Sequence, residues 1–351
     1  MPNSEKLNID IQTSTVFKVI FIILLFWILF LLRNILLLLL FAIMIASAIG
    51  PFADWLDRKH FPRILGVLLL YLTIFGLIFF LLSLVIPLLS GELSQLNGIV
   101  QQFVTTISGV LDKAQSTSGR YFDVLGEVQN LLDSASQYLQ VLSQSVVGLV
   151  VGIFGGILSF FAVIVISFYL SVMRRGIDVF IKSIVPENYE AYLVNLWLRT
   201  EQKVGRWFQA QLLLALIVGL AVFVGLSLLN VKFPLLLGLL AMALELVPMV
   251  GPVMFAIPGI IIAFSQSPTL GLWTLILYVV IQQLESNVLV PLIFGKSLGI
   301  NPVTVVIALL IGFQLAGILG MIVAVPVATI LNEVIDDFAK KKESRRAVSS
   351  T

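Results

Sequence analysis

Long apolar runs with almost no charge dominate this sequence. Between Phe233 and Leu284, Glu245 is the one charged side chain. A domain folded in water carries charge on about a quarter of its residues. Here charged residues make up 11% and hydrophobic residues 59% of the 351 residues, too little polar surface to cover a core in water. Because several runs reach the length of about 17–25 residues that crosses a bilayer, we predict an all-α polytopic membrane protein.

The residue types on which many enzymes and metal sites depend are nearly missing. The chain has no cysteine and a single histidine, His60, which argues against disulfides, thiol nucleophiles, histidine-based metal sites and Ser-His-Asp triads. The sequence contains no GxxxxGK[ST] phosphate loop and no basic stripe interleaved with aromatic residues. We therefore expect no enzyme, no cofactor or metal, no nucleic-acid partner and no ATP-driven transport by this chain alone.

The N-terminal part predicts four membrane helices. The apolar runs Val16–Leu32 and Ile35–Ile49 form an expected hairpin that ends at Gly50-Pro51, and a charged loop follows over residues 51–63. The third and fourth spans are expected at 64–89 and 148–172, so that 1–89 and 146–172 are membrane regions. Gly148, Gly152 and Gly156 are four residues apart, which predicts a face where another helix packs closely.

Two stretches differ from this apolar background. Residues 90–145 carry five acidic against two basic residues and recurring apolar positions at helical spacing, which predicts an amphipathic helical insert outside the membrane. Residues 173–210 are basic and amphipathic, typical of a helix in the membrane interface, although packing on other cytoplasmic segments explains the pattern equally well. The basic regions 51–63, 173–210 and 336–351 are expected inside and the 90–145 insert outside.

The C-terminal transport core, expected over 211–335, contains interrupted apolar segments. Proline and glycine weaken helices, and such interruptions at membrane depth point to a transporter's binding site. Residues 235–265 and 303–331 are either re-entrant hairpins or bent crossings. We favour hairpins, because a straight helix of the first length, about 31 residues, would be about 46 Å long against a bilayer core of about 30 Å. About eight membrane segments result. The expected helix breaks are at Pro248, Gly251, Pro252, Pro258, Pro291, Gly312, Gly317 and Pro326.

Glu245 is the first candidate for chemistry in this core. A carboxylate at membrane depth is costly and is therefore a candidate functional residue. It could carry a proton or bind a cation together with backbone carbonyls freed at the break after it. The competing explanation is that its carboxylate satisfies the unpaired N–H groups of the break at Pro248 to Pro252.

A second polar cluster surrounds Glu285. Glu285 with Gln282, Gln283 and Asn287 could line a hydrophilic path, or it could simply lie at the wet interface. Gln314 is the one strongly polar side chain in 303–331 and could contact a substrate or cap a hairpin tip. These residues and Glu245 form the predicted transport and coupling site.

Several strings resemble a known family. Glu245-Leu246-Val247-Pro248-Met249-Val250-Gly251-Pro252, with Ile257-Pro258 after it, is similar to the E-x-[IV]-P-x-[IV]-G-P signature of the autoinducer-2 exporter-like permeases of bacteria. The string Gln283-Leu284-Glu285-Ser286-Asn287 to Pro291, then Gly299, Asn301 and Pro302, resembles the second signature of this family. Residues 206–211, Arg-Trp-Phe-Gln-Ala-Gln, resemble the family segment that enters the fifth helix.

This resemblance implies a multispanning permease of the bacterial inner membrane. Some family members are described as exporters of autoinducer-2 and others as sodium/proton antiporters, and homo-oligomers are known. We therefore expect a secondary transporter that moves a small polar solute or signal, coupled to protons or sodium. Its expected partners are the lipid bilayer, the solute or ions, and further copies of the chain. The alternatives are an antiporter without organic cargo and a membrane scaffold that transports nothing.

Overall fold

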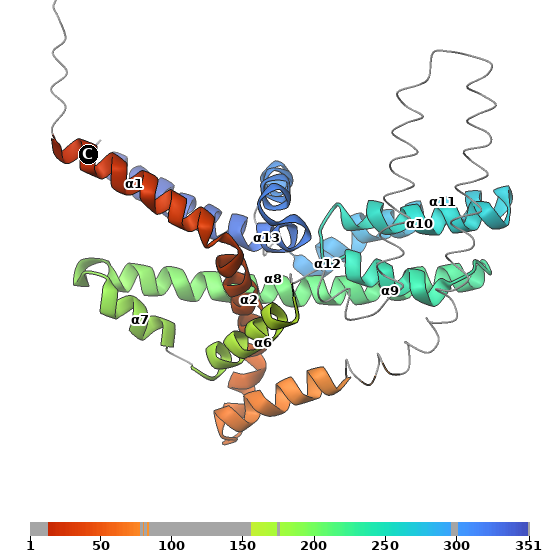
Figure 1. The fold of residues 1–351 in the computed structure, drawn as a ribbon, viewed down its shortest axis with the longest axis horizontal. Helices are drawn as coiled ribbons and strands as arrows, with labels where there is room; N and C mark the ends of the chain where they lie inside the picture. The colour runs from red at the N-terminus through yellow and green to blue at the C-terminus, as the bar shows by residue number, and fades with distance from the viewer. Residues whose placement is uncertain are drawn as a thin grey trace, which may run out of the picture.

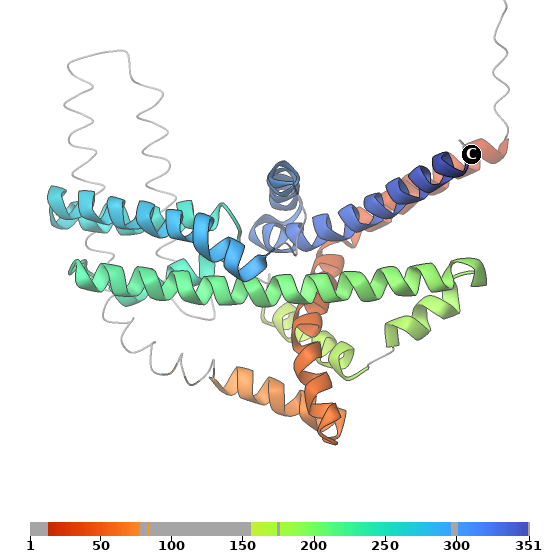
Figure 2. The ribbon, with the colours of Figure 1, turned by 180° about the vertical axis from the view of Figure 1, so that it is seen from behind.

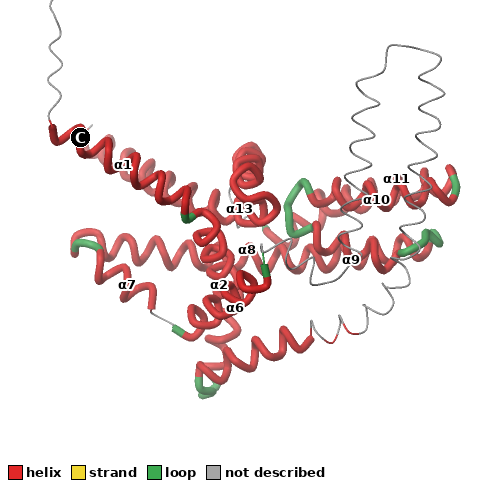
Figure 3. The backbone as a smooth tube through the Cα atoms, in the orientation of Figure 1, coloured by secondary structure: helices red, strands yellow, loops and turns green. Residues whose placement is uncertain are grey.

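The computed structural model describes residues 13–77, 80, 83, 156–173, 176–295 and 301–349. Within these ranges every regular element is a helix (Figure 3), which confirms the predicted all-helical fold. The 90–145 insert, Gly148 and Gly152 lie outside the described residues. The helices are α1 (Thr13–Leu31), α2 (Arg33–Arg58), an unlabelled helix (Arg63–Leu77), α6 (Ile157–Val172), α7 (Gly176–Ile184), α8 (Glu187–Leu228), α9 (Pro234–Leu244), α10 (Gly251–Gln266), α11 (Pro268–Leu284), the π-helix η1 (Glu285–Leu289), α12 (Val290–Phe294) and α13 (Pro302–Ser349).

Four stretches of the described chain are long and apolar enough to cross a membrane. They are Arg33–Arg58, Glu187–Leu228, Pro268–Phe294 and Val303–Lys340, and a fifth is added if α6 and α7 count as one bent span. Shorter apolar helices accompany them, among them α9 and α10. The protein is therefore a multi-pass membrane protein, and the count of eight segments stays a prediction.

The long helix α8 runs through the middle of the structure (Figure 2). It contacts α2, α7, α9, α11, α12 and α13. The expected division at residue 210, between an interfacial helix and a fifth span, is wrong as a helix boundary, because α8 runs unbroken through it. Trp207 and Phe208 are buried, and Phe208 meets Phe41 of α2 edge to face at 6.1 Å between ring centroids. This part of α8 thus packs on α2, a helix that is itself long and apolar enough to cross a membrane.

The helix end expected at Gly50-Pro51 is also wrong. Helix α2 continues through Gly50-Pro51 to Arg58, so most of the expected 51–63 loop is helical. A proline inside a helix removes one N–H donor but does not end the helix where neighbouring helices hold it, and α2 packs on both α6 and α8. Conversely, Gly156 has a φ of 148° and directly precedes α6. Gly156 therefore stands at the start of α6 in a non-helical conformation, and the predicted packing face of the three glycines stays a prediction.

The first interrupted segment is two helices joined by a tight break. α9 ends at Leu244 and α10 begins at Gly251, and the two helices contact each other (Figure 1). Pro248 lies inside the break, and Met249 has a φ of 65°. Gly251 and Pro252 are the first residues of α10, whereas the break expected at Pro258 is wrong because α10 continues through it.

The second interrupted segment bends sharply within α13. Ala316 and Gly317 have non-helical backbone angles, so the helix is interrupted at Gly317. Gly312 and Gly320 then face each other across the bend, and a Cβ on either glycine would overlap the backbone of the other. Two helical arms, 302–315 and 318–349, therefore fold back with their backbones in contact. Gly312 and Pro326 are within the arms and break neither, while Pro291 lies in the first turn of α12.

Candidate functional site

Glu245 lies at the end of α9, where the chain leaves helical geometry. Its side chain is 1% exposed, and one carboxylate oxygen is buried without a hydrogen-bond partner among the described residues. An unpaired buried polar atom costs about 1–3 kcal/mol, and more when it is charged. A group that destabilises the fold in this way is a candidate for function.

The structure argues against the explanation that Glu245 serves the broken helix. The N–H groups of Val247, Val250 and Gly251 donate to the backbone carbonyls of Leu244, Pro248 and Val247 at 2.8–2.9 Å. These donors in the break are satisfied by the main chain itself. The Glu245 carboxylate is therefore not needed to pair them.

Gln211 of α8 fixes the backbone at Glu245. The Gln211 side chain is 2% exposed, and its amide nitrogen donates to the Glu245 carbonyl oxygen. This hydrogen bond joins α8 to the start of the break between α9 and α10. It holds the backbone at Glu245 in place while leaving a side-chain oxygen of Glu245 unpaired.

Glu285 is the second buried carboxylate of the site. It begins the π-helix η1, is 6% exposed, and also has one oxygen without a hydrogen-bond partner among the described residues. π-helical turns are rare and occur often at functional sites. The Glu285 carboxylate is close enough to interact electrostatically with that of Glu245. The fold thus brings together two carboxylates that are forty positions apart in sequence.

The other predicted site residues do not join this pair. Gln283 and Asn287 are exposed and bond to each other, with the Asn287 amide nitrogen 2.8 Å from the Gln283 side-chain oxygen. Gln282 is half-buried, and Gln314 is exposed beside the bend of α13. The described residues contain no group of three or more Asp, Glu, His or Cys that could hold a metal ion.

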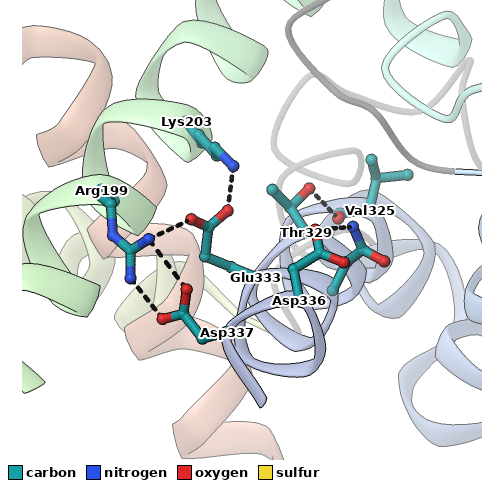
Figure 4. Close-up of polar contacts among 8 residues, drawn as sticks. Arg199, Lys203, Val325, Thr329, Glu333, Asp336 and Asp337 are labelled. Carbon is teal, nitrogen blue, oxygen red and sulfur yellow. Dashed lines mark hydrogen bonds and ion pairs between the residues drawn. The ribbon is translucent and has the colours of Figure 1, made fainter. Parts of the chain in front are cut away.

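A third polar feature, an ion cluster, joins α8 to the second arm of α13 (Figure 4). The Arg199 guanidinium lies 2.6 Å from Asp337 Oδ2 and 3.1 Å from Glu333 Oε1, and the Lys203 ammonium pairs with Glu333. Glu333 and Asp337 are largely buried, whereas both cations are about 40% exposed. The cluster fixes the bent α13 to α8.

Sequence reasoning did not single out several of these residues. In the sequence, Gln211 is one residue of a family-like string, and Glu333 and Asp337 are acidic residues near a basic tail. Glu333 and Asp337 are four residues apart, as are Arg199 and Lys203, so each pair shares a helix face. That spacing predicts a charged helix face for each pair, but it does not predict which two helices meet.

The fold and these polar sites define a class of protein. Several apolar spans, two interrupted apolar segments and a buried carboxylate beside one break, within electrostatic reach of a second, are features of membrane transport proteins.

Comparison with known proteins gives the family. The model of the AI-2E family transporters matches residues 17–340, and the chain belongs to this family. It is 30% identical to YueF of Bacillus subtilis over 290 residues, covering 80% of this chain and 78% of YueF. It is 28% identical to YrrI of the same organism, covering 90% of each chain, and 25% identical to YhhT of Escherichia coli, covering 83% and 81%. All three are named as candidate transport proteins, and family membership confirms the resemblance noted above.

Proposed function

We propose that this protein is a secondary transporter that moves a small polar solute or signal, coupled to protons or sodium through Glu245. The observation that carries the proposal is the buried carboxylate of Glu245 at the α9–α10 break, which has one oxygen without a hydrogen-bond partner among the described residues and lies within electrostatic reach of Glu285. A carboxylate in such a place can change its state by taking up a proton or a sodium ion. Autoinducer-2 is one candidate cargo, because the family is named after its export.

The second candidate function is a sodium/proton antiporter without organic cargo. Two buried carboxylates within electrostatic reach of each other favour it, because a cation that neutralises a carboxylate competes with the proton that would otherwise do so. A scaffold that transports nothing has no use for these costly groups. The buried carboxylates of Glu245 and Glu285 therefore support transport of either kind over a scaffold that transports nothing.

The proposed arrangement in the cell follows the charge distribution. The protein lies in the bacterial inner membrane with both termini in the cytoplasm and the 90–145 insert outside. The segments 235–265 and 303–331 are re-entrant hairpins, and the chain forms homo-oligomers. Fusions of a reporter to the C-terminus and to the insert, together with light scattering in detergent, test these points.

Sodium-driven proton flux in proteoliposomes tests the function. A pH-sensitive dye in the lumen reports proton movement after a sodium pulse, for the native chain beside Glu245→Gln. Glutamine keeps the shape of the side chain and removes its charge, so we expect flux to be abolished and the melting temperature to be maintained. Glu187→Gln, at an exposed glutamate in the first turn of α8, is the matched control and should retain flux. Native flux in Glu245→Gln would refute the coupling role.

A solute exporter and a pure antiporter then differ in one respect. If flux requires an organic solute in the lumen, the cargo-coupled transporter is supported. If sodium and protons exchange without it, the antiporter is supported. Absence of ion-driven flux in the native protein would contradict both versions of ion coupling.

A further inference from the structure

Buried polar atoms without partners are concentrated on one face of α11. In the described part of the chain five buried side-chain atoms have no hydrogen-bond partner: Thr200 Oγ1, Glu245 Oε2, Thr274 Oγ1, Tyr278 Oη and Glu285 Oε2. Three of them lie on α11 and its π-helical continuation, and a fourth is the carboxylate of Glu245, which interacts with Glu285. This concentration is not a general property of the protein. Buried Ser167, Ser171 and Thr329 all donate to a backbone carbonyl.

The three residues of α11 are aligned. At about 100° per residue, Tyr278 and Glu285 are rotated by about 40° and about 20° from Thr274, so all three share one face. The rise from Thr274 to Glu285 is about 16 Å at about 1.5 Å per residue, roughly half of a bilayer core of about 30 Å. We call Thr274, Tyr278 and Glu285 the polar stripe.

The hydroxyl group of Tyr278 is held in the middle of the stripe. Its ring packs on Phe255 of α10, with 5.8 Å between the centroids. The hydroxyl oxygen faces Gly259, one turn further along α10, so closely that a Cβ at that position would overlap it. Tyr278 is 6% exposed and Thr274 is fully buried. Thr274 shares this face of α11, since a Cβ on Gly271, three residues before it, would overlap Phe264 of α10. Neither hydroxyl has a hydrogen-bond partner among the described residues.

We propose that the polar stripe is a hydrated path through which water and small cations reach the carboxylates of Glu285 and Glu245. Buried polar groups without protein partners are satisfied by water where the site is polar. The two hydroxyls do not bond each other, and a bridging water can join polar groups that make no direct hydrogen bond. The inference deepens the proposed function, since the stripe ends at the coupling carboxylates.

Cysteine accessibility tests the path directly, because the chain contains no native cysteine. Thr274→Cys keeps the size of the side chain and introduces a single thiol at the far end of the stripe. Only the thiolate reacts with 2-aminoethyl methanethiosulfonate, a small charged reagent, and it forms where water is present. Val67→Cys is the matched control, because Val67 is fully buried in a separate apolar cluster with Ile49, Ala53 and Tyr71. We expect labelling of Thr274→Cys at least about tenfold faster than that of Val67→Cys.

Tyr278→Phe supplies a second measurement, which does not depend on labelling. It removes only the hydroxyl group, so sodium-driven proton flux should fall about tenfold or more. Its melting temperature should stay at or above the native value, because no protein hydrogen bond is lost. Tyr71→Phe is the control: this buried hydroxyl donates to Ser167 at 2.9 Å, so the variant should melt lower and keep its flux.

The outcomes separate the path from the coupling role. Rapid labelling of Thr274→Cys, with flux lost in Tyr278→Phe, supports the path. Labelling of Thr274→Cys as slow as that of Val67→Cys overturns it, and so does a fall in melting temperature of Tyr278→Phe equal to that of Tyr71→Phe. Rapid labelling together with native flux in Glu245→Gln keeps the path and refutes the coupling role.

Discussion

The ion cluster between α8 and α13 allows a prediction with a worked magnitude. An ion pair exposed to solvent stabilises a protein by about 0.2–1 kcal/mol, while breaking a fully buried pair costs about 3–5 kcal/mol. Arg199 and Asp337 fall between these limits, with side chains 42% and 16% exposed and a closest approach of 2.6 Å. Two hydrogen bonds connect them. Discounted for the screening of the exposed guanidinium, the coupling free energy should be about 1–2 kcal/mol.

A double-mutant cycle measures this coupling. Arg199→Ala, Asp337→Ala and the double variant are unfolded thermally in detergent beside the native chain, at low salt and at 0.5 M salt. At the higher salt the screening length falls to roughly 4 Å, so the coupling should decrease by about half. The matched control is the cycle of Arg206→Ala with Asp337→Ala. Arg206 lies two turns along α8 from Arg199, and its effect should be additive with that of Asp337.

The cycle also has results that would refute the reasoning. A coupling free energy below about 0.3 kcal/mol would mean that the pair contributes no more than a solvated surface contact. An equal coupling in the Arg206 cycle would mean that net charge, rather than this contact, stabilises the protein. A coupling unaffected by salt would mean that the pair is more deeply buried than its exposed guanidinium indicates.

Two further predictions concern the packing that positions the site. Gly320→Ala should lower the free energy of unfolding by about 1–3 kcal/mol in thermal unfolding, because its Cβ would overlap the backbone of Gly312. The control, Gly50→Ala in α2, has no heavy atom within 4 Å of its Cβ and should not lower it. Equal losses of stability in the two variants would contradict the hairpin packing. Gln211→Leu should lower stability by about 1–3 kcal/mol, because it removes the donor to the buried Glu245 carbonyl; an unchanged melting temperature would show that this hydrogen bond does not hold the break.

Some features follow from local composition and were therefore predictable. An apolar run of sufficient length becomes a helix in a bilayer whatever its neighbours are. The break near Pro248 was also predictable, because two prolines and a glycine close together leave several backbone groups without helical partners. Glu245 was identified for the same reason: one charged residue in a long apolar stretch is visible without knowledge of its partners.

Single prolines and glycines were less informative. Pro51, Pro258 and Pro326 all lie inside helices that continue past them. One proline costs a helix a single hydrogen bond and some bending, which neighbouring helices can offset. Whether such a residue ends a helix therefore depends on contacts that are made far away in the sequence.

The site itself was decided by tertiary structure. The sequence specified Glu245 and its chemical type, but its pairing with Glu285 depends on how α9, α10 and α11 fold together. Burial is likewise a property of packing, so nothing local distinguishes Tyr278, whose hydroxyl has no partner, from Tyr71, whose hydroxyl is bonded. The contacts of Gln211 with Glu245 and of Arg199 with Asp337 join segments 34 and 138 residues apart. Local composition determined which segments enter the membrane and where one of them breaks, because those are properties of a single helix in lipid. Which polar groups meet inside the protein was determined by helix packing alone.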